Sequence, residues 1–298
     1  MRTGVAAILA LCVVAAGAAW IVSAPGNVPA ATLDRIKPPG DAAAGKLVFY
    51  AAGCESCHQS AGVDDPAQLG GGRPLATPFG TFYPPNISQD KDDGIGAWSV
   101  EDFAGALLAG RTPTGQPYYP AFPYTSYTNL TPEDVRDLFA YLKTLPAVAG
   151  RAPAHALGFP FNLRRGVGLW QALFFARGPE AMPGSGAPAP MERGRYLVTG
   201  PGHCGECHTP RNALGALDSS RALMGAPAPD GKGKIAGITA HGLKDWSEAD
   251  IADALSSGFT PSGDVLGGSM APVVRNMAHL PAADRTAIAH YLKSLGAP

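Results

Sequence analysis

Two short stretches of this chain share one pattern, in which two residues separate a pair of cysteines and a histidine follows directly: Cys54-Glu55-Ser56-Cys57-His58 and Cys204-Gly205-Glu206-Cys207-His208. This pattern attaches a haem of the c type. One helical turn brings both thiols to the two vinyl groups of a single porphyrin, and the adjacent imidazole then lies under the iron. The two stretches therefore predict two covalently bound haems c, with His58 and His208 as the proximal iron ligands.

Zinc binding, thiol redox chemistry and structural disulfides are the other uses of such cysteine pairs. A four-cysteine zinc site places its two pairs about 15 to 20 residues apart, whereas the motifs here begin at residues 54 and 204. A thioredoxin-like pair needs a surrounding βαβ pattern, which this sequence lacks. Because the two pairs also use four of the five cysteines, haem attachment is the favoured interpretation.

The composition limits the class of protein. The chain of 298 residues is long enough for two domains. Its 38 glycines and 29 prolines predict long loops, which a rigid apolar haem can hold in place. A formal net charge of −1 gives no basic stripe, so nucleic acid is excluded as a partner.

The N-terminal residues predict export. Residues 4 to 24 carry no charge, and Arg2 stands just before them. This segment is longer than the h-region of a secretory signal peptide and about long enough to span a bilayer, so residues 1–27 are expected to be a signal anchor. A cleaved signal peptide remains the alternative, because Val22-Ser23-Ala24 resembles a cleavage site. The expected location is the periplasmic face of a bacterial inner membrane, or the soluble periplasm after cleavage.

The two halves of the chain repeat one plan. Trp98-Ser99 matches Trp246-Ser247 at an offset of 148 residues, and in each case the serine followed three residues later by aspartate predicts a helix N-cap. Gly110 and Gly258 stand at the same offset, where each helix would end with a C′ glycine. A position in one half therefore predicts the matching position in the other half.

Two further pairs of segments complete the repeat. Amphipathic runs at residues 131–145 and 281–295 predict a helix near the end of each half, and Pro132 is a favourable first helical residue. Short helices are expected at residues 45–49 and 194–198, just before the haem motifs.

This order of helix, haem motif, loops, middle helix, ligand loop and terminal helix resembles the cytochrome c fold. The resemblance implies an all-α protein with two tandem cytochrome c domains, at residues 41–146 and 191–298, after the N-terminal hydrophobic segment. In that fold the first and last helices cross at a small residue, for which Gly45 and Gly194 are the candidates.

Residues 147–190 are expected to connect the two domains. Residues 179–190 are rich in Pro, Gly, Ala and Ser and predict a flexible linker. Residues 159–175 are expected to form a packed inter-domain segment, because polar residues interrupt a stretch too short for a second membrane span. Arg164 and Arg165 are interpreted as solvated side chains rather than as partners of haem propionates.

The distal iron ligands are expected to differ between the halves. Met270 lies in the loop between the middle and terminal helices and is the predicted sixth ligand of the second haem, with Met277 as its competitor. Moving back by 148 residues leads to Phe122, whose side chain cannot bind iron. The first haem therefore lacks the obvious sixth ligand.

Three alternatives remain for the distal side of the first haem. The site is open and covered by Phe122, His155 approaches from the connecting segment, or a methionine reaches across. The candidate methionines are Met182, Met191 and Met277.

The chain also resembles the cytochrome subunits of bacterial membrane-bound alcohol and gluconate-type dehydrogenases. The resemblance is carried by residues 70–83 (GGGRPLATPFGTFY), 85–88 (PNIS), 94–99 (GIGAWS), 119–127, 202–212 (GHCGECHTPRN) and 267–276 (GGSMAPVVRN). Those subunits usually carry three haems and place a methionine where Phe122 stands. The two motifs here indicate a separate two-haem branch.

What this resemblance implies is an electron relay rather than an enzyme. A periplasmic dehydrogenase or another donor would reduce one haem, and the other would pass electrons toward quinone or a terminal oxidase of the respiratory chain. Two alternatives use an open first iron, as a peroxidase-like haem enzyme or as a binder of gas ligands such as carbon monoxide. For the enzyme, an open iron alone does not supply the acid and base groups that oxygen chemistry requires, and Tyr118, Tyr119 and Tyr124 are the nearby candidates for such roles.

Overall fold

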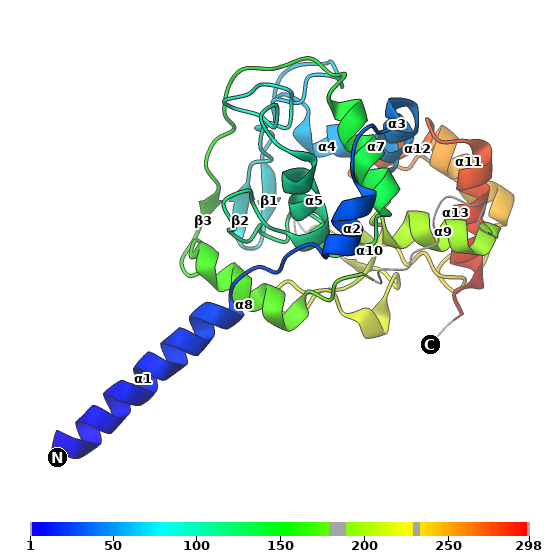
Figure 1. The fold of residues 1–298 in the computed structure, drawn as a ribbon. Helices are drawn as coiled ribbons and strands as arrows, with labels where there is room; N and C mark the ends of the chain where they lie inside the picture. Colours follow the sequence, from blue (N-terminus) through cyan, green and yellow to red (C-terminus); the bar gives the residue numbers. More distant parts are fainter. Residues whose placement is uncertain (1, 179–188, 229–232, 297–298) are drawn as a thin grey trace.

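The computed structural model describes residues 2–178, 189–228 and 233–296, and its regular structure is mostly helical (Figure 1). In chain order the elements are α1 Arg2–Val22, α2 Ala30–Arg35, α3 Ala42–Ala51, α4 Cys54–His58, β1 Leu75–Thr77, β2 Gly80–Phe82, α5 Val100–Ala109, α6 Tyr124–Tyr127, α7 Pro132–Leu142, β3 Ala156–Leu157, α8 Arg164–Phe174, α9 Pro190–Thr199, α10 Gly205–His208, the 3₁₀ turn η1 Ser219–Arg221, β4 Ala226–Pro227, β5 Lys234–Ile235, α11 Glu248–Ser257, α12 Met270–Met277 and α13 Ala282–Ser294.

Two small antiparallel sheets were missing from the all-α prediction. One has the order β1-β2-β3, with Gly80 of β2 opposite Leu157 of β3. The other joins β4 to β5. Strands of two or three residues are too short to show an alternating pattern in the sequence, which explains why they were not expected. Because β3 belongs to the connecting segment, this segment is attached to the first half by a backbone ladder.

Helices cross closely at the two predicted glycines. A Cβ atom added to Gly45 of α3 would lie 1.9 Å from the carbonyl oxygen of Asp137 in α7. In the second half, a Cβ on Gly194 of α9 would lie 1.9 Å from the carbonyl oxygen of Ala287 in α13. Since no side chain fits at such a distance, both crossings require glycine, and the expectation drawn from the resemblance to the cytochrome c fold is confirmed.

The predicted ends of the middle helices are also confirmed. Ser99 and Ser247 each form a capping box with an aspartate three residues later, at the start of α5 and α11. Gly110 and Gly258 follow these helices with φ of 58° and 81°, the left-handed conformation that favours glycine.

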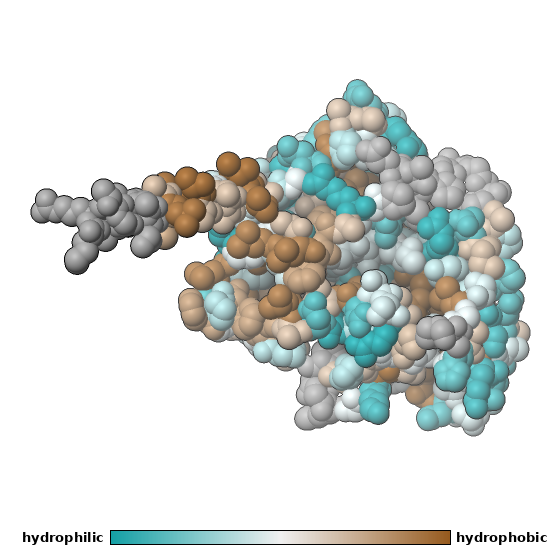
Figure 2. All heavy atoms as spheres, turned by 90° about the horizontal axis from the view of Figure 1, so that it is seen from below, coloured by the Kyte–Doolittle hydropathy of each residue, from teal (hydrophilic) through white to brown (hydrophobic). Residues whose placement is uncertain are grey.

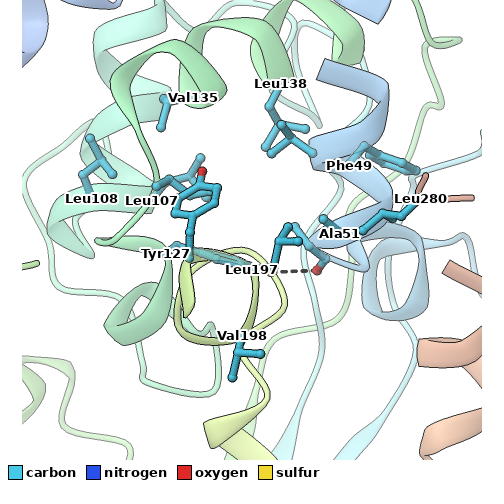
Figure 3. Close-up of a cluster of buried hydrophobic side chains, with 14 of the residues drawn as sticks. Phe49, Ala51, Leu107, Leu108, Tyr127, Val135, Leu138, Leu197, Val198 and Leu280 are labelled. Atoms are coloured by element: carbon cyan, nitrogen blue, oxygen red, sulfur yellow. Dashed lines mark hydrogen bonds between the residues drawn. The ribbon is translucent and has the colours of Figure 1, made fainter. Parts of the chain in front are cut away.

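Buried apolar side chains from both halves form one continuous cluster. In Figure 3, Leu197 of α9 lies next to Tyr127 of α6 and Ala51 of α3. Tyr196 of α9 also donates a hydrogen bond to the carboxylate of Asp134 in α7. The first and second halves therefore share hydrophobic core as well as sequence plan.

The N-terminal helix α1 projects from the body of the molecule (Figure 1). Nothing is described of the side chains of residues 1–9 and 16. Within the described residues, no helix combines the length and the apolar character needed to cross a membrane. The signal anchor or signal peptide stays a prediction.

Hydrogen bonds from α8 hold the connecting segment to both halves. Gln171 of α8 is buried and donates to the carbonyl oxygen of Gly110, while Trp170 donates to the carbonyl oxygen of Leu214 in the second half. The expected packing of residues 159–175 is therefore confirmed only in part, because Phe159 and Leu173 of this segment are 79% and 72% exposed. Most of the expected linker, residues 179–188 with Met182, lies outside the described residues.

Candidate haem sites

The first motif forms the short helix α4, which follows Gly53 in the left-handed conformation. The Nδ1 atom of His58 lies 2.8 Å from the carbonyl oxygen of Pro85. Because a carbonyl can only accept, Nδ1 carries the proton, and Nε2 of the neutral ring keeps its lone pair. Burial lowers the pKa of His58, which favours this neutral form. The imidazole is thus oriented as a metal-binding histidine requires.

The second motif repeats this arrangement in α10. The Nδ1 atom of His208 lies 2.7 Å from the carbonyl oxygen of Ala236, and burial again lowers the histidine pKa. The orienting carbonyls of Pro85 and Ala236 were not found from the sequence, because every residue carries a carbonyl and only the fold decides which one is aimed at the ring.

The four motif cysteines are unpaired thiols in the structure. Burial is the main reason why the pKa values of Cys54 and Cys204 rise to about 12. Zinc binding and thiol exchange use the thiolate, so these surroundings disfavour both. A pair of protonated thiols beside a neutral imidazole fits the attachment of haem c, in which the thiols become thioethers. The residues of both motifs therefore fit the group.

The two motifs meet at one backbone carbonyl. The oxygen of Ala52, two residues before Cys54, accepts a hydrogen bond of 2.9 Å from the hydroxyl of Tyr127. Nε2 of His203, the residue before Cys204, lies 3.3 Å from the same oxygen. The Tyr127 and His203 rings also meet edge to face, with 5.6 Å between centroids. The segments that lead into the two motifs are therefore in direct contact.

Each motif is also held by the other half. Glu206 of the second motif accepts hydrogen bonds from Thr125 Oγ1 at 2.6 Å and Ser126 Oγ at 3.1 Å, both in α6. In return, Nδ2 of Asn276 in α12 donates to Ser56 Oγ of the first motif at 2.9 Å. The polar side chains between the two cysteines are thus anchored across the boundary between the halves.

These contacts follow the repeat. Ser126 and Asn276 stand 150 residues apart, and so do Ser56 and Glu206. Each half therefore offers the same two positions to the other, as in the self-complementary interface of a twofold dimer. This interface was not expected from the sequence, although polar pairs at the shared offset of 150 are a signal that could have indicated it.

The two methionines of α12 occupy different surroundings. Met270 is the first residue of the helix and is half-buried. Met277, near the end of the helix, is only 4% exposed and belongs to the shared hydrophobic core. Packing therefore accounts for Met277, whereas Met270 stays the predicted sixth ligand of the second haem.

Phe122 lies in an aromatic cluster at the corresponding place of the first half. Its ring contacts Tyr118, Tyr124 and Tyr127 at centroid distances of 5.5, 6.3 and 5.7 Å. Burial is the main reason why the pKa of Tyr127 lies well above its usual value. The cluster thus borders the first haem motif with apolar and phenolic groups.

His155 has another role in the structure. The backbone N–H of Tyr83 donates to Nδ1 of His155 over 3.2 Å, which places the proton of the neutral ring on Nε2. Its ring also packs against Phe82 and Tyr119. This geometry disfavours His155 as an iron ligand, since neither ring nitrogen has a free lone pair.

Comparisons with known proteins agree with this geometry. The cytochrome c family model matches residues 42–146. A dihaem c-type cytochrome of Cereibacter sphaeroides is 52% identical over 260 residues, which cover 87% of each chain.

Two further relatives are parts of dehydrogenases. The cytochrome c subunit of gluconate 2-dehydrogenase from Pantoea cypripedii is 37% identical over 263 residues, which cover 85% of this chain and 59% of that subunit. The cytochrome subunit of fructose dehydrogenase from Gluconobacter japonicus is 36% identical over 255 residues, or 85% of this chain and 52% of that subunit. The present chain spans less than two thirds of either dehydrogenase subunit. With its haem motifs, glycine crossings and these relatives, the chain belongs to the family of c-type cytochromes.

Proposed function

We propose that this chain binds two haems c and relays electrons from a periplasmic dehydrogenase, or another donor, toward quinone or a terminal oxidase of the respiratory chain. The dehydrogenase subunits among its relatives support this class of donor. The uncharged N-terminal segment would hold the protein at the periplasmic face of the inner membrane. No substrate chemistry is assigned to this chain.

The observation that carries the proposal is the direct contact between the two motif segments at the Ala52 carbonyl. A relay needs two redox centres held close together in a fixed arrangement. His203, Tyr127 and the pairs that Glu206 and Asn276 form across the boundary supply that rigidity.

The residues of this chain would hold and orient the two haems. Each haem iron supplies a one-electron couple between the ferric and ferrous states. His58 and His208 present neutral Nε2 atoms on the proximal sides, and Met270 is assigned to the distal side of the second iron. At the first motif, Phe122 packs against Tyr118 and Tyr127, so aromatic rings would border the first haem.

Haem counting tests the proposal. The pyridine haemochrome assay on the purified protein should give two haems per chain, and a redox titration should take up two electrons. The double variant Cys54→Ala/Cys57→Ala should retain one haem, as should Cys204→Ala/Cys207→Ala. Cys12→Ala is the matched control and should retain both. A native chain with one haem would contradict the proposal.

Reoxidation tests the direction of the relay. The protein reduced with ascorbate should return to the ferric state when decylubiquinone or inner-membrane vesicles with active oxidase are added. A reduced protein that neither acceptor reoxidises would contradict a respiratory role.

A further inference from the structure

Exposed apolar side chains gather on the face of the body next to α1 (Figure 2). They come from α8 and from the segment just before it, which β3 and Gln171 fix to the body. Their exposed fractions are 79% for Phe159, 72% for Leu173, 54% for Leu163, 41% for Phe161 and 40% for Leu169. Soluble surfaces rarely expose so many large apolar residues together, and such a patch marks an interaction site.

The exposed face of α8 is apolar. Its buried face is formed by Val167, Gly168 and the polar Gln171. Its outer face carries Leu169, Ala172 and Leu173, none of them charged. An ordinary surface helix turns its polar side to water, so the outer face of α8 is built for an apolar neighbour.

The patch is continuous with the base of α1. A Cβ atom on Gly168 would lie 1.9 Å from the carbonyl oxygen of Ser23, so α8 closely approaches the backbone directly after α1. The guanidinium of Arg165 lies 3.9 Å from the centre of the exposed Trp20 ring and donates to the Trp20 carbonyl. Tryptophan and arginine are residues that anchor proteins at the headgroup level of a membrane.

We propose that the outer face of α8, together with residues 159–163, lies on the lipid bilayer beside the point where α1 enters it. This inference rests on the membrane attachment in the proposed function. An apolar helix face that lies in the plane of the interface gains from burial at the boundary of headgroups and acyl chains. A lipid surface is favoured over a protein partner because the patch adjoins the uncharged helix and the outer face of α8 carries no polar side chain for specific pairing.

The contact of α8 with lipid, in addition to α1, would fix the orientation of the protein on the membrane. If α1 alone held the protein, the body could rotate about the axis of α1. A contact through α8 would turn a defined side of the body toward the lipid. Because α8 bonds to Gly110 in the first half and to Leu214 in the second, the orientation of α8 would be passed to both haem motifs.

Spin labels on the holoprotein test this surface. In a Cys12→Ala background, Leu173→Cys places a label on the outer face of α8. Ala249→Cys places a control label at an exposed position of α11, at the far end of the body from α1 (Figure 1). The full chain is reconstituted in vesicles of phosphatidylethanolamine and phosphatidylglycerol. Collision rates are then measured with oxygen, which concentrates in lipid, and with a water-soluble nickel chelate.

The expected result is a ratio of oxygen to nickel collisions several-fold higher at position 173 than at position 249. If the protein floats with the vesicles but the two positions give equal ratios, the α8 contact is wrong and the attachment through α1 stands. Low collision rates with both reagents at position 173 would show cover by protein, from a second copy or another subunit, and would also overturn the proposal. A chain that does not float would overturn both the contact and the attachment. Haem content and absorption spectra of the variants confirm that each is folded.

Discussion

The two halves of this protein have the same residues for attaching a haem but different residues at the position expected for the sixth iron ligand. Both motifs place a histidine Nδ1 on a backbone carbonyl, at 2.8 Å for His58 and 2.7 Å for His208. The distal segments diverge, since α12 begins with Met270 and the corresponding segment before α6 carries Phe122. A repeated fold can therefore conserve the attachment of a cofactor while leaving the chemistry of its other face free to change.

The largest expected effect on stability comes from the glycines at the two helix crossings, where the halves are alike. Gly45→Val and Gly194→Val should each destabilise the protein by more than about 3 kcal/mol, because a Cβ would overlap a backbone oxygen that cannot move away. Thermal unfolding of the purified holoproteins measures the effect. Gly166→Val in α8 is the control, since a Cβ there meets nothing within 4 Å. Tolerance of valine at one crossing only would show that the halves are not equivalent.

The distal ligands provide the sharpest test of the difference. The reduced protein should bind about one equivalent of carbon monoxide, at the first haem. Phe122→Met should remove this binding by supplying a sulfur ligand. Binding of no carbon monoxide by the native protein would refute the open first site.

Replacing Met270 tests the second haem. Met270→Ala should abolish the absorption band that arises from the bond of methionine sulfur to ferric iron. It should also raise carbon monoxide binding by the reduced protein to about two equivalents. Met277→Leu is the control and should keep the band, because Met277 is accounted for by the core. If the band survives in Met270→Ala and disappears in Met277→Leu, the ligand assignment moves to Met277.

The polar contacts across the boundary test whether the halves support each other equally. Asn276→Ala and Ser126→Ala should each lower the free energy of unfolding by about 1 kcal/mol, the usual contribution of a hydrogen bond. A double-mutant cycle of Asn276→Ala with Ser56→Ala measures the coupling. Ser262→Ala is the control, because its hydroxyl bonds to Thr260 within an exposed turn rather than across the boundary. Additive effects in the cycle would contradict a direct contact.

The smallest expected effect concerns two aspartates at equivalent positions. Asp134 accepts a hydrogen bond from Tyr196 of the other half, whereas Asp284 pairs with Arg193 of its own half. Burial raises the pKa of Asp134 above its value in an unfolded chain. The folded state therefore binds the proton more tightly, and this contribution to stability is present at low pH and lost as the pH rises through the folded pKa.

Asp134→Asn should remove this pH dependence without lowering stability at neutral pH, as measured by urea unfolding at acidic and neutral pH. Asp250→Asn is a control of opposite sign, because hydrogen bonds from Ser247 lower the pKa of that carboxyl. If the stability of Asp134→Asn depends on pH as that of the native protein does, Asp134 is not the source of the pH dependence.

Much of the fold followed from local patterns. The capping serines and the C′ glycines were predicted, because each expresses a steric or hydrogen-bonding rule that acts within a few residues. The crossing glycines were expected from the resemblance to the cytochrome c fold. The short strands and α10-to-α6 contacts were not predicted, since two-residue strands leave no periodic signal and contacts across the halves depend on how the halves are placed.

By itself the sequence determined the two attachment motifs and the absence of a methionine at the position of Phe122, because covalent attachment and ligand chemistry depend on residue type and spacing alone. Only the tertiary structure decided which carbonyls orient His58 and His208, that Ala52 joins the two motif segments, and that α8 turns its leucines outward. Carbonyls are the same in every residue, and the direction of a helix face is set by the elements that pack against it.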